Sequence, residues 1–179
     1  MTVPVLGDLT RDSRFPEWLE SEAIEVPVLG TGKRRFVLEN YEKDKAQEEF
    51  QEAIANFLKL SPVALKAAEE PIFRYYQDVA EDYDDEDFEE AGIPPLTEAS
   101  EVWEHIQLAE VIHVSRRPYG DKKIYLSLSC GCDWEEEHGL MIVFKQGLFV
   151  NKVGGYDGHL TNSDAYGSSR FEDVVYREL

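Results

Sequence analysis

The chain has 179 residues, 42% hydrophobic and 12% aromatic, which is enough for a core and too many for a disordered chain. Its formal net charge of −19 argues against nucleic acid or an anionic membrane as a direct partner, because either would require a basic face. No segment approaches the run of about 18 apolar residues that crosses a membrane. Residues Met1–Asp8 lack the basic and apolar regions of a signal peptide. We therefore expect a soluble, cytoplasmic protein.

The first 40 residues predict short strands and turns. Two apolar runs, Glu25–Leu29 and Arg35–Leu38, flank the segment Gly30–Lys33, which is typical of a hairpin turn. Pro27 would suit an edge strand, where a missing N–H breaks no ladder hydrogen bond.

Three helices are predicted in the middle of the chain. Apolar side chains follow helical spacing over residues 44–59. A second helix begins with Ser61 as N-cap and Pro62 at the first helical position, and it extends to about Tyr83. Pro71 either kinks this helix or divides it. The third helix covers residues 97–107, with Thr97 or Ser100 as its cap.

The negative charge is concentrated in one stretch. Residues 75–115 contain 13 of the 37 acidic residues and no Lys or Arg, whereas both flanks are close to balanced. Within it, residues 81–95 are expected to form an acidic loop inside a single domain that spans residues 1–179. Such a loop is either a solvated segment or a docking surface for a basic protein. An EF-hand calcium loop is excluded, because Asp87 stands where the sixth position requires Gly. The candidate partner surface is Asp82, Asp84, Asp85, Glu86, Asp87, Glu89 and Glu90.

The C-terminal part predicts strands at residues 111–114, 123–130, 139–144 and 148–153, the last two joined by a turn at Gln146-Gly147. In residues 123–130 the alternation is clean: Tyr125, Ser127 and Ser129 face away from the apolar side. The fold class is therefore α+β. It has short N-terminal strands, a helical middle and a C-terminal antiparallel sheet of at least four strands packed on the helices.

The block Cys130–Thr161 gathers side chains that can carry chemistry. Its candidate functional cluster is Trp134, Glu135, Glu137, His138, Gly139, Asp157 and His159. Cys130, Cys132, His138 and His159 are the residue types that bind zinc, but their spacing matches no standard zinc motif. A buried Cys also packs as a small hydrophobic residue. We therefore predict neither a metal nor a cofactor.

Two further interpretations of this block remain. Glu137, His138, Asp157 and His159 could act as acid and base in a small metal-dependent or hydrolytic enzyme. The sequence has no nucleophile elbow, phosphate loop or His-Glu-x-x-His motif, so no catalytic residue is assigned. The structural interpretation is stronger. In it Trp134 anchors a turn with its ring buried and its N–H bonded, His138 bonds the turn backbone or a carboxylate, and Gly139 supplies an unusual backbone angle.

Three segments carry a family resemblance: Trp103-Glu-His-Ile106, Cys130-Gly-Cys-Asp-Trp-Glu-Glu-Glu-His-Gly-Leu140 and Asp157-Gly-His-Leu-Thr161. With the upstream helices and Tyr75-Tyr76, they resemble an uncharacterised bacterial family of domains of unknown function, over most of residues 45–165. The resemblance implies a Trp-containing helix end, a strand, an acidic turn and a hairpin. It supplies no catalytic residue, and it associates the chain loosely with immunity proteins of bacterial toxin systems.

The favoured function is a non-catalytic interaction domain that binds a basic protein partner, for example as a toxin-immunity protein. The enzyme centred on Glu137, His138, Asp157 and His159 is the alternative. The sequence fixes no substrate, partner identity or oligomeric state.

Overall fold

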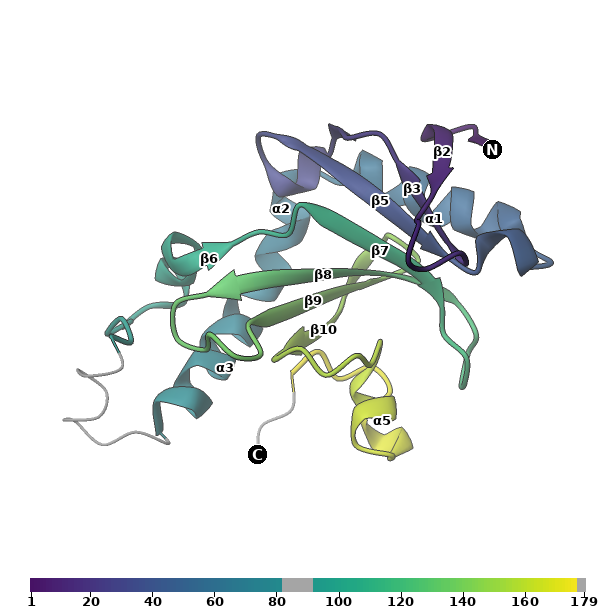
Figure 1. Cartoon of the computed structure of the whole chain (residues 1–179). Coiled ribbons are helices and arrows are strands. Elements are labelled where there is room, and N and C mark those ends of the chain that lie inside the picture. Colours follow the sequence, from purple (N-terminus) through teal and green to yellow (C-terminus); the bar gives the residue numbers. More distant parts are fainter. Residues whose placement is uncertain (82–91, 177–179) are drawn as a thin grey trace.

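The computed structural model describes residues 1–81 and 92–176, which form one mixed sheet with helices α1, α2 and α3 on one face (Figure 1). In these residues the sheet has ten strands, eight of which follow the order β1-β2-β3-β5-β7-β8-β9-β10. The short strands β4 and β6 pair with β5 and β8. Among the pairs in the described chain, only β5 and β7 run parallel.

The N-terminal strands are β1 (Thr2–Val3), β2 (Gly7–Arg11), β3 (Trp18–Ser21), β4 (Ile24–Glu25) and β5 (Lys33–Glu39). β4 and β5 pair antiparallel, as the predicted hairpin requires. The prediction of a strand as far as Leu29 is wrong, because Pro27–Leu29 form a 3-10 turn. Proline suits the first position of such a turn, where its fixed φ is already helical. The turn carries Val28 and Leu29 into the core.

The first two predicted helices are present with different bounds. α1 covers Gln47–Lys59, after a 3-10 turn at Tyr41–Lys43. The long helix predicted from Ser61 is divided into α2 (Pro62–Leu65), a 3-10 turn (Lys66–Ala68) and α3 (Glu69–Glu81). The division precedes Pro71, which lies in the first turn of α3. A proline there removes no intrahelical hydrogen bond, so it permits the helix instead of kinking it.

The third predicted helix is shorter and tighter than expected. A 3-10 helix spans Ala99–His105, and Ile106–Gln107 form β6 against β8. Its N-cap is Glu98, in a reciprocal capping box with Glu101, so the predicted caps Thr97 and Ser100 are wrong. None of the helices in the described part of the chain is long and apolar enough to cross a membrane.

The C-terminal strands confirm the predicted antiparallel sheet. They are β7 (Val111–Arg116), β8 (Ile124–Cys132), β9 (Leu140–Lys145) and β10 (Phe149–Gly154). A short helix, α5 (Asn162–Ala165), and a 3-10 turn (Ser169–Phe171) follow. The parallel pairing of β5 with β7 joins the N-terminal strands to this sheet. Such a pairing needs a long crossover, which α1, α2 and α3 provide.

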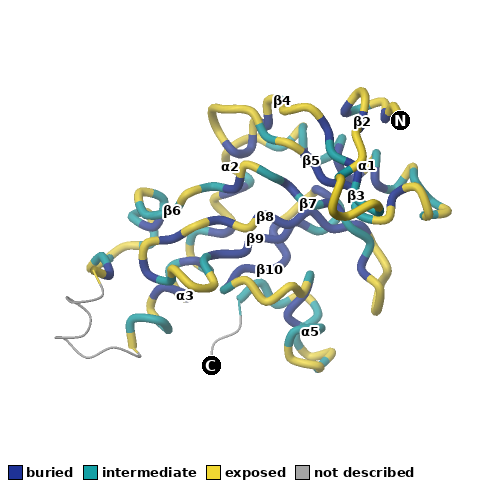
Figure 2. The backbone as a smooth tube through the Cα atoms, viewed as in Figure 1, coloured by how far each residue is buried: buried dark blue, intermediate teal, exposed yellow. Residues whose placement is uncertain are grey.

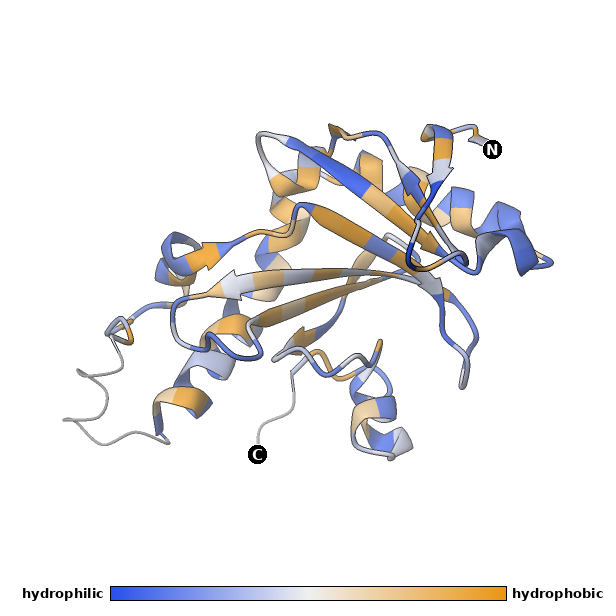
Figure 3. Cartoon of the chain, viewed as in Figure 1, coloured by the Kyte–Doolittle hydropathy of each residue, from blue (hydrophilic) through white to orange (hydrophobic). Residues whose placement is uncertain are grey.

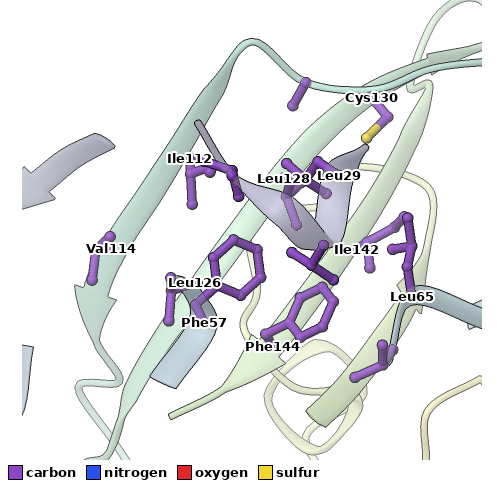
Figure 4. Packing of buried hydrophobic residues seen from close by; sticks show 14 of the residues in the cluster. Leu29, Phe57, Leu65, Ile112, Val114, Leu126, Leu128, Cys130, Ile142 and Phe144 are labelled. Carbon is purple, nitrogen blue, oxygen red and sulfur yellow. The ribbon is translucent and has the colours of Figure 1, made fainter. Parts of the chain in front are cut away.

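The main core lies between the sheet and the three helices. Figure 2 shows buried residues along the central strands, and Figure 3 shows apolar residues concentrated on the same strands. Phe57 of α1 packs edge-on against Phe144 of β9, with ring centroids 4.9 Å apart (Figure 4). Leu126 and Leu128 of β8 point into this core, as the alternation predicted. Tyr125 and Met141 lie in a second, smaller cluster with Val143 and Leu160.

A β-bulge in β10 decides which of its side chains face the helices. Val150 pairs with Phe144 and Lys152 with Val143, so Asn151 is an extra residue in the ladder. Val150 and Val153 therefore both enter the main core, although three positions separate them. Lys152 stands opposite Val143, on the sheet face away from the helices.

Candidate functional site

A cavity of about 890 Å³ lies on the sheet face opposite α1, α2 and α3. Its floor is made by side chains of β7, β8 and β9: His113, Ser115, Ser127, Ser129 and Met141. Trp18 and Glu39 line one end. The remaining wall comes from Asn40, Asp44, Arg116, Pro118, Tyr119, Tyr156, Gly158, His159, Leu160, Ser163, Asp164, Gly167, Ser168 and Ser169. The C-terminal segment that contains α5 therefore forms one side of the cavity.

A buried lysine fixes the start of this C-terminal segment. The Lys152 side chain is 2% exposed, and its ammonium donates to the Asp157 carboxylate and, over 3.0 Å, to the His159 carbonyl. The same Asp157 oxygen accepts from the His159 backbone N–H at 2.9 Å. Burial lowers the pKa of Lys152, and the nearby Asp157 carboxylate partly offsets this decrease. Asp157, Gly158 and His159 thus wrap around one ammonium group, with Gly158 at a φ of +75°.

A buried arginine fixes the end of the segment. The Arg117 side chain is 2% exposed and donates two hydrogen bonds to Asp164, of 2.7 and 2.8 Å. It also donates two to Glu172. These bonds lower the pKa of both carboxyl groups. Thr161 caps α5 by accepting from the Asp164 N–H. Lys152 on β10 and Arg117, which directly follows β7, thus hold the cavity wall.

At the other end of the cavity, Asp44 is paired with an arginine, whereas Glu39 contacts a histidine. Arg116 forms two hydrogen bonds with Asp44, of 2.6 and 3.0 Å, and one of 2.6 Å with Glu49. Its guanidinium lowers the pKa of Asp44. Glu39 lies 2.8 Å from Nδ1 of His113, and the two side chains are 28% and 29% exposed. Trp18 stands nearly perpendicular to the His113 ring, with centroids 5.3 Å apart.

The acidic turn at Trp134–Gly139 is organised by Glu135. One Glu135 carboxylate oxygen accepts from the backbone N–H groups of Glu137 and His138, at 2.9 and 3.1 Å. His138 was predicted to make such a bond with its ring, but its Nδ1 stays 3.6 Å from Glu135 and its side chain is 58% exposed. Gly139 has a φ of +58°, and a Cβ there would lie 2.6 Å from the Cys130 carbonyl oxygen. The predicted need for Gly139 is confirmed.

Trp134 is buried, as predicted, with 2% of its surface exposed. Its ring packs edge-on against Tyr75 and Tyr76 of α3, with centroids 6.4 and 5.8 Å apart. The predicted hydrogen bond of its N–H is wrong, since no acceptor among residues 1–81 and 92–176 meets the indole nitrogen. The aromatic contacts with α3 hold the ring instead.

The four candidate zinc ligands lie in different places. Cys130 and Cys132 are buried in the core between sheet and helices. His159 lines the cavity on the other face of the sheet, and His138 is exposed on the turn. Within the described chain, no three His, Cys, Asp or Glu side chains are grouped as a metal site would require.

The side chains of the four residues in the enzyme alternative, Glu137, His138, Asp157 and His159, also do not converge on one site. The turn and the Asp157 segment meet through the backbone, because the Tyr156 N–H donates to the His138 carbonyl at 3.1 Å. Glu137 is exposed, and Asp157 is engaged by Lys152. His159 has its Nδ1 3.7 Å from Asp157. The seven acids from Asp82 to Glu90 lie outside the described residues.

The burial of the two thiols leads to a first prediction. Desolvation raises the pKa of Cys130 to about 11 and that of Cys132 to about 12, from 9.0. Both groups are therefore neutral at neutral pH, and we expect a thiol reagent to modify the folded protein slowly and both cysteines rapidly in denaturant. The pKa values of both thiols are higher in the folded than in the unfolded chain. Burial of the neutral thiols therefore contributes fully to the free energy of unfolding below about pH 9, and this contribution falls as the pH rises towards 11. Urea unfolding across that range measures the loss.

The matched control is the variant Cys130→Ala/Cys132→Ala. It should lose less unfolding free energy than the natural protein between about pH 8 and pH 10, before most tyrosines titrate. Fast modification of the folded protein, or equal losses for both proteins, would contradict the burial of the thiols.

The cavity residues Trp18, Glu39 and His113 were not predicted as a site. They come from three strands whose order depends on the parallel pairing of β5 with β7, which the sequence does not indicate. One signal was present: Ser127 and Ser129 alternate with leucines on a strand that proved central. Small polar side chains on one face of a strand inside the sheet indicate that this face is not covered by close packing, so that it can form the floor of a cavity.

The fold and cavity define an α+β domain with helices on one sheet face and a binding-sized cavity on the other. Residues 5–160 match the family described as domain of unknown function DUF6985, and the chain belongs to that family. The comparison confirms the resemblance to an uncharacterised domain family. Neither the curated proteins nor the solved structures contain a match to the chain.

Proposed function

We propose that this protein is a non-catalytic binding domain that holds a segment of a partner protein in the sheet cavity. The observation that carries the proposal is the cavity itself. Its volume of about 890 Å³ is in the upper part of the range of roughly 300–1,000 Å³ typical of ligand sites. From Glu39 on β5 to Met141 on β9 there are three strand spacings, or about 14 Å, which matches about four extended residues.

The lining supports a polypeptide ligand. Hydroxyl groups from six serines and the imidazoles of His113 and His159 can bond a backbone, while Trp18, Tyr119 and Tyr156 offer aromatic contact. The net charge of −19 favours a basic partner. Toxin immunity is one specific form of this function, in which the protein covers a basic toxin surface. It is tested by whether an equimolar amount of the protein abolishes the activity of such a toxin.

Photo-crosslinking in the source cells tests the cavity as the binding surface. A photoreactive amino acid at Tyr119, which lines the cavity and is 73% exposed, should give a defined adduct with a partner protein. The matched control position is Val63 on α2, which is 71% exposed on the helical side. Equal adducts from both positions would contradict the proposal.

A cavity-filling substitution gives a second, quantitative test. Ser129→Trp places a large ring on the floor, and we expect it to weaken binding of the crosslinked partner at least about tenfold, which corresponds to ~1.4 kcal/mol. Ser129→Ala removes only the hydroxyl and should bind within about threefold of the natural protein. Isothermal titration measures both affinities. Unchanged affinity for Ser129→Trp would exclude the cavity as the binding site.

Acid–base catalysis in the same cavity is a second candidate function. The observation in its favour is the Glu39–His113 contact of 2.8 Å, because a carboxylate at Nδ1 orients an imidazole as a base. No serine hydroxyl of the described residues bonds His113, so the arrangement lacks an activated nucleophile. This candidate has more geometric support than the cluster of Glu137, His138, Asp157 and His159.

A further inference from the structure

Glu39 differs from the other acidic residues of the cavity in its partner. Asp44 and Asp164 each accept two hydrogen bonds from an arginine. Among the described residues, the Glu39 carboxyl group has a hydrogen-bond partner only in the His113 imidazole. An arginine can give a carboxylate two charge-assisted hydrogen bonds, whereas His113 makes one contact with Glu39, through Nδ1. The end of the cavity at Glu39 therefore presents a carboxyl group that no arginine of the described residues occupies.

An aromatic wall stands beside this carboxylate. Trp18 on β3 is the direct cross-strand partner of Glu39 on β5. The indole stacks on Phe15, with centroids 4.2 Å apart, and its position is further fixed by the perpendicular contact with His113. Neighbouring residues thus hold both the carboxylate and the indole, so that neither must be ordered when a ligand binds.

We propose that the Trp18–Glu39–His113 end of the cavity is a subsite for a cationic side chain of the partner, with arginine preferred. A guanidinium group can form two hydrogen bonds with a carboxylate and stack on an aromatic ring, which a compact ammonium group does less well. The attraction of a cation to the indole adds to this preference. The inference rests on the proposed function and specifies which partner chemistry the cavity selects.

Short peptides can test the subsite without a known partner. The probes are acetylated, amidated pentapeptides Gly-Gly-Xaa-Gly-Gly with arginine, citrulline or leucine at Xaa, titrated into the ¹⁵N-labelled full chain. Citrulline has nearly the shape of arginine without the charge. We expect the arginine peptide to bind at least about fivefold more tightly than the citrulline peptide, because a charged hydrogen bond is stronger than a neutral one. In NMR spectra, the largest chemical-shift changes should occur at the Trp18 indole N–H and at the backbone amides of Ser127 and Ser129.

Two carboxylate variants give the matched control. Glu39→Gln should remove the preference for arginine over citrulline. Glu20→Gln should keep it, because Glu20 lies on β3 near Trp18 but pairs with Arg35 and does not line the cavity. The citrulline comparison uses the natural chain, so it stands even if Glu39→Gln perturbs the fold. Equal affinities for the two peptides, or shifts scattered over other acidic surfaces, would overturn the subsite. Neither result affects the Ser129→Trp test of the cavity.

Discussion

Replacement of Gly147 by alanine should lower the free energy of unfolding by about 2–5 kcal/mol. Gly147 lies within the β9–β10 turn with a φ of +66°, a conformation that costs a residue with a side chain about 1–2 kcal/mol. The turn also rests on α1: an added Cβ would lie 1.9 Å from the Ala53 carbonyl oxygen and 2.9 Å from the Phe57 nitrogen. Both atoms belong to the helix backbone, so turn and helix must separate, at a further cost of about 1–3 kcal/mol.

Gly167→Ala is the matched control for this effect. Gly167 has a similar φ of +60°, but an added Cβ there meets no atom within 4 Å. The control should therefore cost only the conformational part, about 1–2 kcal/mol. Urea denaturation followed by circular dichroism measures both variants. Equal losses for the two would show that the contact with α1 contributes nothing, and that the Gln146-Gly147 turn is merely a local feature.

Arg117→Met should destabilise the protein by about 3 kcal/mol and release the C-terminal segment from the sheet. The arginine is the shared partner of Asp164 and Glu172, and removal of one member of a buried ion pair typically costs about 3–5 kcal/mol. The lower end applies, because the two carboxylate side chains are 20% and 33% exposed. Urea denaturation measures the loss, and hydrogen exchange should show faster opening of residues 161–175.

The control is Arg35→Met, which removes an exposed arginine paired with Glu20 at 3.3 Å and should cost less than about 1 kcal/mol. The pH dependence supplies a further check. Arg117 lowers the pKa of Asp164 and Glu172, so its contribution is present above about pH 4.5 and is lost as the pH falls below about 4. The difference between Arg117→Met and the natural protein should shrink in the same range. A loss no larger than that of Arg35→Met would contradict the role of Arg117.

Much of the fold was predictable because local pattern and final environment agree. α1 shows its buried stripe at helical spacing, and β8 alternates because one face meets the helices. β10 was predicted as a strand, but its bulge was not. Its apolar residues at positions 150 and 153 depart from the period of two, and that departure marks the extra residue Asn151.

The candidate site was predicted less well than the fold. The block Cys130–Thr161 attracted attention because it gathers Cys, Glu and His. In the structure Glu135 bonds its own turn and Asp157 bonds Lys152, so these acids serve the local fold. Of the seven residues in the predicted cluster, all of which lie in the described chain, only His159 lines the cavity. Glu39 and His113 are 74 positions apart, and their meeting depends on strand order, which composition and periodicity do not encode.

The parallel pairing of β5 with β7 also constrains the order in which the chain can fold. It joins Phe36 to Ile112, whereas β7 to β10 are connected through much shorter loops. Closing the long loop costs entropy before any pairing rewards it, so the C-terminal meander has the kinetic advantage. During synthesis on the ribosome, β5 cannot pair with β7 until most of the chain has emerged. Until then one edge of β5 is unpaired and open to association with other chains. Nascent chains of this protein are therefore most exposed to aggregation while residues 33–39 are outside the ribosome and residues 111–116 are not.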